Sequence, residues 1–156
     1  MTVRVGLGFD VHPFSEDPAR RLVLGGVRLE GPGLAGHSDA DVIAHAVADA
    51  LLGGAGLGDL GDHFPADDQA WAGADSMGLL ARVMAEVSQS WLVGNVDCAV
   101  VLEAPRLAPH RPAIEAGLSE AVGAPVSVKP KRAEGLGALG RREGIACWAV
   151  VLLESR

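Results

Sequence analysis

Hydrophobic and polar residues alternate along residues 3–12 of the chain. Every second side chain from Val3 to Val11 is apolar. This period of two is typical of a half-buried β-strand, because successive side chains point to opposite faces of a sheet. Asp10 and His12 therefore lie side by side on the face opposite the apolar residues. A carboxylate and an imidazole placed in this way can chelate one metal ion, and they need a third ligand from elsewhere.

The segment 42–52 has the composition of a helix that can supply this ligand. Ser38 and Asp41 resemble a capping box ahead of it, with Ser38 as the N-cap. Asp41 then falls in the first turn, where the helix dipole favours a negative charge. We expect the helix to end at the Gly53-Gly54 pair.

One polar stripe runs along this predicted helix. Asp41, His45 and Asp49 recur every four residues, whereas the opposite side is apolar. A histidine flanked by two aspartates is well placed to bind a metal or to act in catalysis. Asp10, His12 and His45 together form the candidate metal site. The alternative is a histidine that only bonds to Asp41 or Asp49, and the spacing alone does not decide between the two.

Strand-like and helical segments continue to interleave along the rest of the chain. They are two short strands around the Gly25-Gly26 turn, a helix from about Asp75, a strand over 96–102, a helix ending at Gly123, and strands over 126–129 and 145–153. This order, without repeats or linkers, predicts a single α+β domain over residues 1–156. We expect a two-layer sandwich in which helices cover one face of a mainly mixed or antiparallel sheet.

Composition narrows the class of protein. Apolar residues make up 49% of the 156 residues and charged residues 21%, which excludes a disordered chain. The net charge of −7 argues against a general nucleic-acid binder. The apolar runs are too short to span a bilayer, and no basic and apolar leader precedes the first strand. We therefore expect a cytoplasmic protein without a membrane partner, in which Cys98 and Cys147 are free thiols.

A second candidate for chemistry is the segment 129–144, which contains five cations and four glycines. Guanidinium and ammonium groups bind phosphate, and glycine lets backbone N–H groups approach it. A basic, glycine-rich loop alone is more often solvated surface. Beside a metal site it favours phosphoryl chemistry, in which a metal ion and cations neutralise phosphate charge.

Nine segments carry a resemblance to a known family. In chain order they are Gly8-Phe9-Asp10-Val11-His12, Gly36-His37-Ser38-Asp39-Ala40-Asp41-Val42, His45, Asp49-Ala50-Leu51-Leu52-Gly53, Leu57-Gly58-Asp59-Leu60-Gly61, Phe64-Pro65, Gly73-Ala74-Asp75-Ser76, Gly94-Asn95-Val96-Asp97 and Gly144-Ile145-Ala146. Over nearly its whole length the chain resembles the 2-C-methyl-D-erythritol 2,4-cyclodiphosphate synthase family. The resemblance implies a homotrimer with an active site at each subunit interface. It also implies conversion of 4-diphosphocytidyl-2-C-methyl-D-erythritol 2-phosphate to the cyclic diphosphate and CMP, in non-mevalonate isoprenoid biosynthesis.

The resemblance assigns metal ions to four residues. Asp10, His12 and His45 match the family's zinc ligands, in agreement with the site inferred from their spacing, and three protein ligands leave the fourth position of Zn²⁺ open. Glu134 matches the residue that helps to hold a second divalent ion, Mg²⁺ or Mn²⁺, across the substrate diphosphate. Because the substrate's own 2-phosphate attacks the β-phosphorus, the implied task of the protein is positioning and charge neutralisation.

Further residues match positions that contact the cytidine diphosphate substrate. His37 matches a catalytic histidine that stabilises the transition state, and His37 and Ser38 precede a helix whose N–H groups can meet phosphate. Asp59 and Gly61 match positions that hold the methylerythritol hydroxyls, and the segment 104–108 matches the one that embraces cytosine. The substrate-binding set implied in this way is Asp10, His12, His37, Ser38, Asp59, Gly61, Phe64, Asp68, Ala104, Pro105, Arg106, Leu107, Ala108, Glu134 and Arg141.

The chain departs from the family pattern at three places. Arg132 stands where a threonine usually contacts the reacting phosphates, so it is a candidate catalytic residue that supplies more charge with a different geometry. Ala66 replaces a frequent aspartate, and Ala138 replaces a larger apolar residue near the nucleotide. Since the zinc ligands are unchanged, we expect a variant but active enzyme.

Two other functions would use the same residues. A metal-dependent phosphohydrolase would attack with metal-bound water and need a general base, for which Asp41, Asp49 and Asp59 are candidates. The other alternative is a non-catalytic trimer that binds an isoprenoid phosphate.

Overall fold

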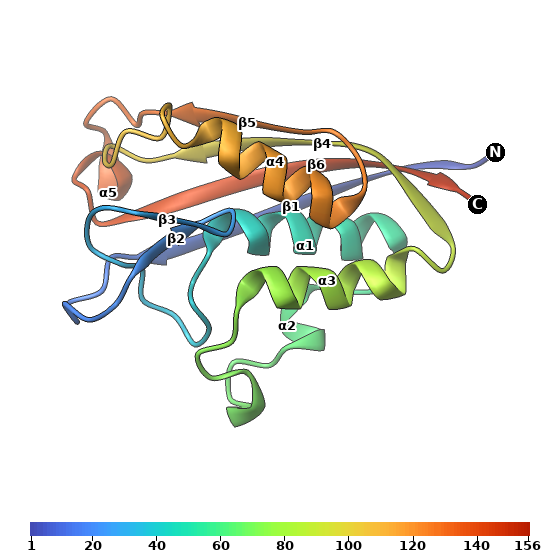
Figure 1. Ribbon diagram of the computed structural model, residues 1–156, viewed down its shortest axis with the longest axis horizontal. Coiled ribbons are helices and arrows are strands. Elements are labelled where there is room, and N and C mark those ends of the chain that lie inside the picture. Colours follow the sequence, from blue (N-terminus) through green and yellow to red (C-terminus); the bar gives the residue numbers. More distant parts are fainter.

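A four-stranded sheet forms the centre of the computed structural model, which describes residues 1–156 (Figure 1). In their order across the sheet, the strands are β1 (Val3–Pro13), β6 (Gly144–Ser155), β4 (Trp91–Val101) and β5 (Val126–Lys131). β6 pairs antiparallel with both β1 and β4, whereas β5 pairs parallel with β4. The sheet is therefore mixed, and β1 and β5 are its two edges.

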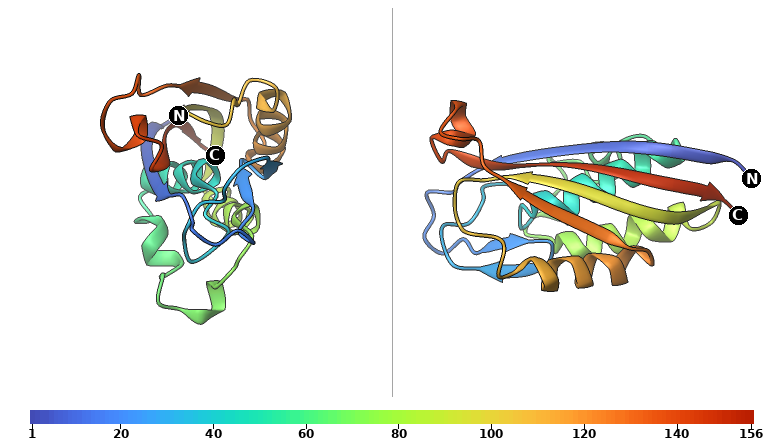
Figure 2. Two further views of the ribbon diagram at one scale, coloured as in Figure 1. Left: turned by 90° about the vertical axis from the view of Figure 1, so that its left-hand side faces the viewer. Right: turned by 90° about the horizontal axis from the view of Figure 1, so that it is seen from above.

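Three longer helices cover one face of this sheet. They are α1 (Val42–Ala55), α3 (Ser76–Val87) and α4 (Arg111–Val122), and they lie behind the strands in the right-hand view of Figure 2. The smaller elements are the hairpin of β2 (Leu22–Leu24) and β3 (Val27–Leu29), the short helices α2 (Leu60–His63) and α5 (Gly137–Gly140), and the 3₁₀-helix η1 (Gln69–Trp71). The predicted sheet with helices on one face is confirmed. No helix is both long and apolar enough to cross a membrane.

The buried face of β1 is not the apolar one. Val5 and Leu7 are each 65% exposed, whereas the glycines that follow each of them, Gly6 and Gly8, are buried. The alternation is confirmed, but the glycine side of the strand meets α1. A Cβ atom at Gly8 would lie 2.0 Å from the carbonyl oxygen of Ala46, so only glycine lets the helix backbone come this close.

The apolar side chains of β1 instead lie on the outer face of the sheet. The rings of Phe9 and Trp148, on neighbouring strands, have centroids 4.9 Å apart. The exposed apolar residues on β1, β4 and β6 are Val3, Val5, Leu7, Phe9, Val11, Leu92, Trp148 and Val150. An extended exposed apolar surface is typical of an interaction site.

The bounds of α1 differ from the prediction at both ends. Asp41, not Ser38, is the N-cap, and its carboxylate accepts hydrogen bonds from the backbone N–H groups of Ile43 and Ala44. Asp41 is fully buried, so it is not part of an exposed polar stripe. The helix also continues through Gly53-Gly54 to Ala55, because Gly54 faces β1 and a glycine there permits the same close packing.

The other boundaries are close to those expected. β4 begins at Trp91, five residues before the predicted start, and its extra residues pair with the end of β6, which continues to Ser155. α4 ends at Gly123 as predicted, with this glycine in the left-handed conformation. The predicted loop after β5 contains the single turn of α5.

Two glycine substitutions test the role of close packing between β1 and α1. Gly8→Ala places a methyl group against backbone atoms of α1, and we expect a loss of about 3 kcal/mol or more in the free energy of unfolding. Gly53→Ala, on the same helix, meets nothing closer than 3.9 Å, and we expect a gain of about 0.5–1 kcal/mol from helix propensity. Chemical denaturation of both variants measures the two effects. Equal and small effects would contradict the packing argument.

Candidate metal centre and substrate pocket

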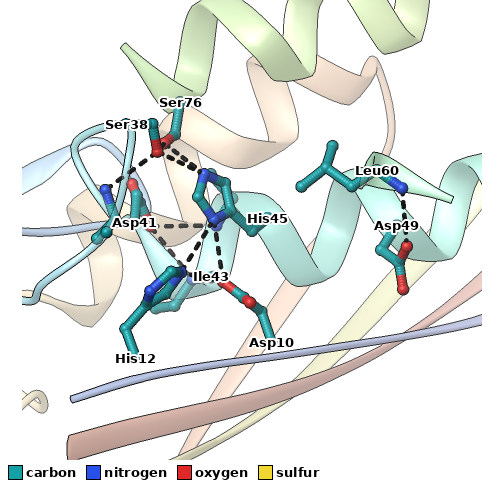
Figure 3. Close-up of polar contacts among 12 residues, drawn as sticks. Asp10, His12, Ser38, Asp41, Ile43, His45, Asp49, Leu60 and Ser76 are labelled. Carbon is teal, nitrogen blue, oxygen red and sulfur yellow. Dashed lines mark hydrogen bonds and ion pairs between the residues drawn. The ribbon is translucent and has the colours of Figure 1, made fainter. Parts of the chain in front are cut away.

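Three side chains from β1 and α1 converge on one point (Figure 3). Asp10 Oδ2 lies 2.8 Å from His12 Nε2 and 3.0 Å from His45 Nδ1, and the two ring nitrogens are 3.4 Å apart. Asp10 and His12 are on the inner face of β1 because they continue the period of Gly6 and Gly8. The predicted juxtaposition is thus confirmed.

A backbone carbonyl determines which nitrogen of His12 faces this point. Its Nδ1 lies 2.9 Å from the carbonyl oxygen of Ala35. A carbonyl only accepts hydrogen bonds, so Nδ1 carries the proton and Nε2 presents its lone pair to Asp10 and His45. Such a second hydrogen bond is typical of a metal-binding histidine.

The charges of Asp10 and His12 reflect their proximity. Burial raises the pKa of the Asp10 carboxyl, but hydrogen bonds and charge from His12 and His45 outweigh it, and the pKa lies below its usual value. Burial lowers the pKa of His12, yet the hydrogen bond and charge of Asp10 raise it overall. Both shifts have the same physical cause, which is the close contact between the Asp10 carboxylate and an imidazole.

The donor set fits a divalent metal ion. One carboxylate oxygen and two imidazole nitrogens lie within 4.8 Å of one another. Three such ligands hold an ion and leave a position free for another ligand. The alternative, in which His45 only bonds to Asp41 or Asp49, is wrong, because its Nδ1 lies 3.0 Å from Asp10 Oδ2 and its Nε2 faces Ser76 and Ser38.

A hollow of about 440 Å³ opens above this cluster. Its lining includes the predicted residues Asp10, His12, His37, Ser38, His45, Asp59, Gly61 and Phe64. It also contains Phe9, Leu60, Trp71 and Leu79, which the sequence did not indicate as site residues. Two further lining residues are Asp49, which the sequence indicated as a candidate general base on the polar stripe, and Ala66, which it indicated as a departure from the family pattern. Trp71 packs edge-on against Phe64, with ring centroids 4.9 Å apart, and nothing in the local sequence pattern signals that contact.

Two contacts hold the loop that carries His37 and Ser38. The His37 ring, through Nε2, bonds to the carbonyl oxygen of Asp68 at 2.8 Å, so Asp68 contributes its backbone here rather than its carboxylate. Arg20 donates from Nε to the carbonyl of Leu34 and from Nη2 to the carbonyls of Gly36 and Ser38. Arg20 is a supporting residue that the sequence did not indicate.

The predicted cytosine segment lies at a second hollow, of about 460 Å³. The residues lining this hollow are Leu102, Glu103, Pro105, Arg106, Leu107, Ala108, Pro130, Lys131 and Arg132. It lies beside β5, whereas the metal cluster lies on β1, and these strands are three spacings apart across the sheet, or roughly 14 Å. Within one chain the two predicted halves of the site therefore line separate hollows.

The Arg132 guanidinium forms an ion pair with the side chain of Glu103. Its Nη2 donates to Glu103 Oε2 at 2.9 Å, and Glu103 Oε1 accepts from the backbone N–H of Ala133 at 2.7 Å. The Glu103 side chain is only 4% exposed, and the hydrogen bond from Arg132 holds its pKa below the usual value. Glu134 follows in the left-handed conformation, with φ of 54°, and is exposed. Contact of Arg132 with phosphate stays a prediction.

Other cations of the basic segment also have acidic partners. Lys129 pairs with Asp97 at 2.6 Å, and Arg141 pairs with Glu143 at 2.7 Å. The segment is therefore less positive than its five cations indicate.

Comparison with known proteins agrees with this arrangement. The chain is 49% identical to a 2-C-methyl-D-erythritol 2,4-cyclodiphosphate synthase of Thermosynechococcus vestitus, over 99% of this chain and 98% of that one. It is 50% identical to a bifunctional IspD/IspF enzyme of Anaeromyxobacter dehalogenans, covering 97% of this chain but only 40% of that relative.

Solved structures show the same fold. IspF of Plasmodium falciparum in complex with CDP superimposes with a TM-score of 0.85 at 31% identity, over 99% of this chain and 97% of that one. A CDP-bound 2C-methyl-D-erythritol-2,4-cyclodiphosphate synthase gives a TM-score of 0.86 at 36% identity, over 97% of this chain and all of that one. Residues 3–154 match the YgbB family. The chain belongs to the YgbB family.

Proposed function

We propose that the protein is a metal-dependent lyase that forms 2-C-methyl-D-erythritol 2,4-cyclodiphosphate and CMP from 4-diphosphocytidyl-2-C-methyl-D-erythritol 2-phosphate. The observation that carries the proposal is the cluster of Asp10, His12 and His45 at the floor of a hollow also lined by His37 and Ser38. The names of full-length relatives support it. The CDP complexes of its structural neighbours support a cytidine diphosphate ligand.

We infer that the ion held by the cluster is Zn²⁺. Two imidazoles and one carboxylate match its preference for nitrogen and oxygen ligands in tetrahedral geometry. The open fourth position suits a substrate phosphate oxygen, and the ion would supply a positive charge there. A second ion, Mg²⁺ or Mn²⁺, prefers oxygen ligands, and the exposed carboxylate of Glu134 is its proposed protein ligand.

In the proposed reaction, an oxygen of the substrate 2-phosphate forms a bond to the β-phosphorus. The bond from that phosphorus to the oxygen shared with the CMP phosphate breaks, and CMP leaves with this oxygen. The chain needs no nucleophile of its own, so its residues position the phosphates and stabilise charge. His37, oriented by the Asp68 carbonyl, stabilises the transition state, and Ser38 binds phosphate. The N–H groups at the start of α1 do not take part as the sequence predicted, because the buried Asp41 carboxylate already accepts from those of Ile43 and Ala44. Asp59 and Gly61 hold the methylerythritol hydroxyls.

We further propose that the enzyme is a homotrimer with composite active sites. The apolar outer face of the sheet supports this, because it offers an extended surface for a second copy. The separation of the two hollows supports it as well, since the cytosine segment 104–108 and Glu134 lie on the β5 side of the sheet, away from the metal cluster on β1, and a neighbouring subunit can bring them to that cluster.

Turnover in water enriched in ¹⁸O tests the proposed reaction. Intramolecular attack takes no oxygen from solvent, so mass spectrometry should find unlabelled cyclic diphosphate and unlabelled CMP. A phosphohydrolase would instead incorporate the label into a product phosphate. Absence of turnover with metal-loaded protein would favour a non-catalytic binding trimer. Either of these last two results would contradict the proposal.

His45→Ala is expected to remove zinc and activity together while the protein stays folded and trimeric. Two ligands from one strand make a poor tetrahedral site, whereas the apolar side of α1 is unchanged. Metal analysis, activity and sedimentation of the purified variant measure this. His110→Ala is the matched control, because His110 lies outside both hollows, and it should keep its zinc. Full zinc occupancy in His45→Ala would contradict the ligand assignment.

Leu7→Glu is expected to prevent trimer formation. It places a charge at the centre of the apolar outer face, and burying an unpaired charge costs several kcal/mol. Analytical ultracentrifugation should show a monomer mass for this variant and a trimer mass for the original protein. Leu57→Glu, at an exposed position after α1, is the control and should remain trimeric. A trimeric Leu7→Glu protein would rule out this face as the interface.

A further inference from the structure

His45 makes a second set of contacts on the side of its ring that faces away from Asp10. Its Nε2 lies 2.7 Å from Ser76 Oγ and 3.1 Å from Ser38 Oγ. Ser76 is the first residue of α3 and is 1% exposed, and His45 is 7% exposed. The shorter of the two contacts thus joins the candidate metal ligand to a buried hydroxyl on a different helix (Figure 3).

Asp39 determines the direction of the hydrogen bond between Ser76 and His45. Ser76 Oγ is in short contact with Asp39 Oδ1. A carboxylate only accepts hydrogen bonds, and a serine hydroxyl has one proton to donate. Ser76 therefore donates to Asp39, and its oxygen accepts from Nε2–H of His45. The hydroxyl cannot donate to both neighbours.

The tautomer of His45 follows from this count of protons. A neutral imidazole carries one N–H, and when that proton is on Nε2 the Nδ1 atom has a free lone pair. This lone pair points to Asp10 Oδ2, 3.0 Å away. His12 is oriented through its other nitrogen by the Ala35 carbonyl, so each ring has its own supporting acceptor.

Asp39 is itself fixed by the backbone. Its Oδ2 accepts from the N–H of Ser76 at 3.1 Å, and its Oδ1 accepts from the N–H of Asp41 at 3.1 Å. The carboxylate thereby ties the start of α1 to the start of α3. It can orient the Ser76 hydroxyl without being displaced by ligands in the hollow.

We propose that Ser76 and Asp39 are positioning residues for the metal site, acting through the chain Asp39–Ser76–His45. They hold His45 in the tautomer and ring orientation in which Nδ1 binds the ion. This inference rests on the proposed metal site, and it extends that site to a residue of α3 that touches neither the ion nor the substrate.

The test compares the Zn²⁺ affinity of three full-length proteins by competition with a chromophoric chelator. Ser76→Ala removes the nearer acceptor of the Nε2–H and leaves only Ser38 Oγ, 3.1 Å away, so the Zn²⁺ affinity is expected to fall by roughly 10–100-fold. Asp75→Ala is the matched control. Asp75 directly precedes Ser76 and is the N-cap of α3, so its removal lowers the free energy of unfolding by about 1 kcal/mol. The Zn²⁺ affinity of this variant should stay within about twofold of that of the original protein.

A spectroscopic measurement separates positioning from a loss of fold. In the zinc-loaded protein with ¹⁵N-labelled histidine, the Nε2–H proton of His45 is expected to give a slowly exchanging NMR signal. Ser76→Ala should broaden or abolish this signal, whereas Asp75→Ala should retain it. If Ser76→Ala does not fold, Asp39→Asn replaces it. The new amide N–H donates to Ser76 Oγ, so the Ser76 hydroxyl donates its hydrogen bond to Nε2 of His45, which favours the tautomer protonated at Nδ1. The same losses of Zn²⁺ affinity and of the NMR signal are expected.

Two outcomes overturn different statements. If the unmodified protein does not bind Zn²⁺, the proposed metal site is wrong. If it binds Zn²⁺ but Ser76→Ala matches Asp75→Ala in affinity and in the His45 signal, the positioning role is wrong while the metal site stands.

Discussion

The close packing of α1 on β1 is the constraint on which the rest of the structure depends. Gly6 and Gly8 leave no side chain between strand and helix, and the helix backbone comes within reach of the strand backbone. The next two inward positions of β1 are Asp10 and His12, and the facing position on α1 is His45. The metal cluster forms where the run of small residues gives way to ligating side chains.

The same constraint accounts for the outer face of the sheet. Because the inner side of β1 is taken up by glycine and by polar ligands, its apolar residues lie on the side without helices. The sequence of β1 thus determines both the position of the metal ligands and the apolar character of the outer face. The inner face of β1 holds the candidate metal ligands, and its outer face is an exposed apolar surface of the kind found at interaction sites.

The sequence indicated the metal cluster because period two places Asp10 beside His12 and a nearby helix can supply His45. The spacing left open whether His45 instead bonds to Asp41 or Asp49, and the structure decides it by placing His45 Nδ1 at Asp10. It did not predict which face of β1 is buried, since alternation is the same whichever face meets the helices. The prediction of Ser38 as the N-cap was wrong because Ser38 and Asp41 both suit that position. The Asp41 carboxylate also accepts hydrogen bonds from the N–H groups of Gly25 and Gly26 in the hairpin, and the local sequence does not indicate this contact. The pairing of Arg132 with Glu103 joins residues 29 positions apart, which no local pattern indicates.

The central claim is that each active site has a metal half from one subunit and a nucleotide half from the next. Mixed trimers of His45→Ala and Glu134→Gln test it most directly, because His45→Ala inactivates the metal half and Glu134→Gln inactivates the nucleotide half. After joint unfolding and refolding of differently tagged subunits at equal amounts, random assembly gives about a quarter of the interfaces two intact halves. The account predicts that two nearly inactive proteins regain about a quarter of the original activity when mixed. Mixed trimers that stay as inactive as the separate variants would contradict it.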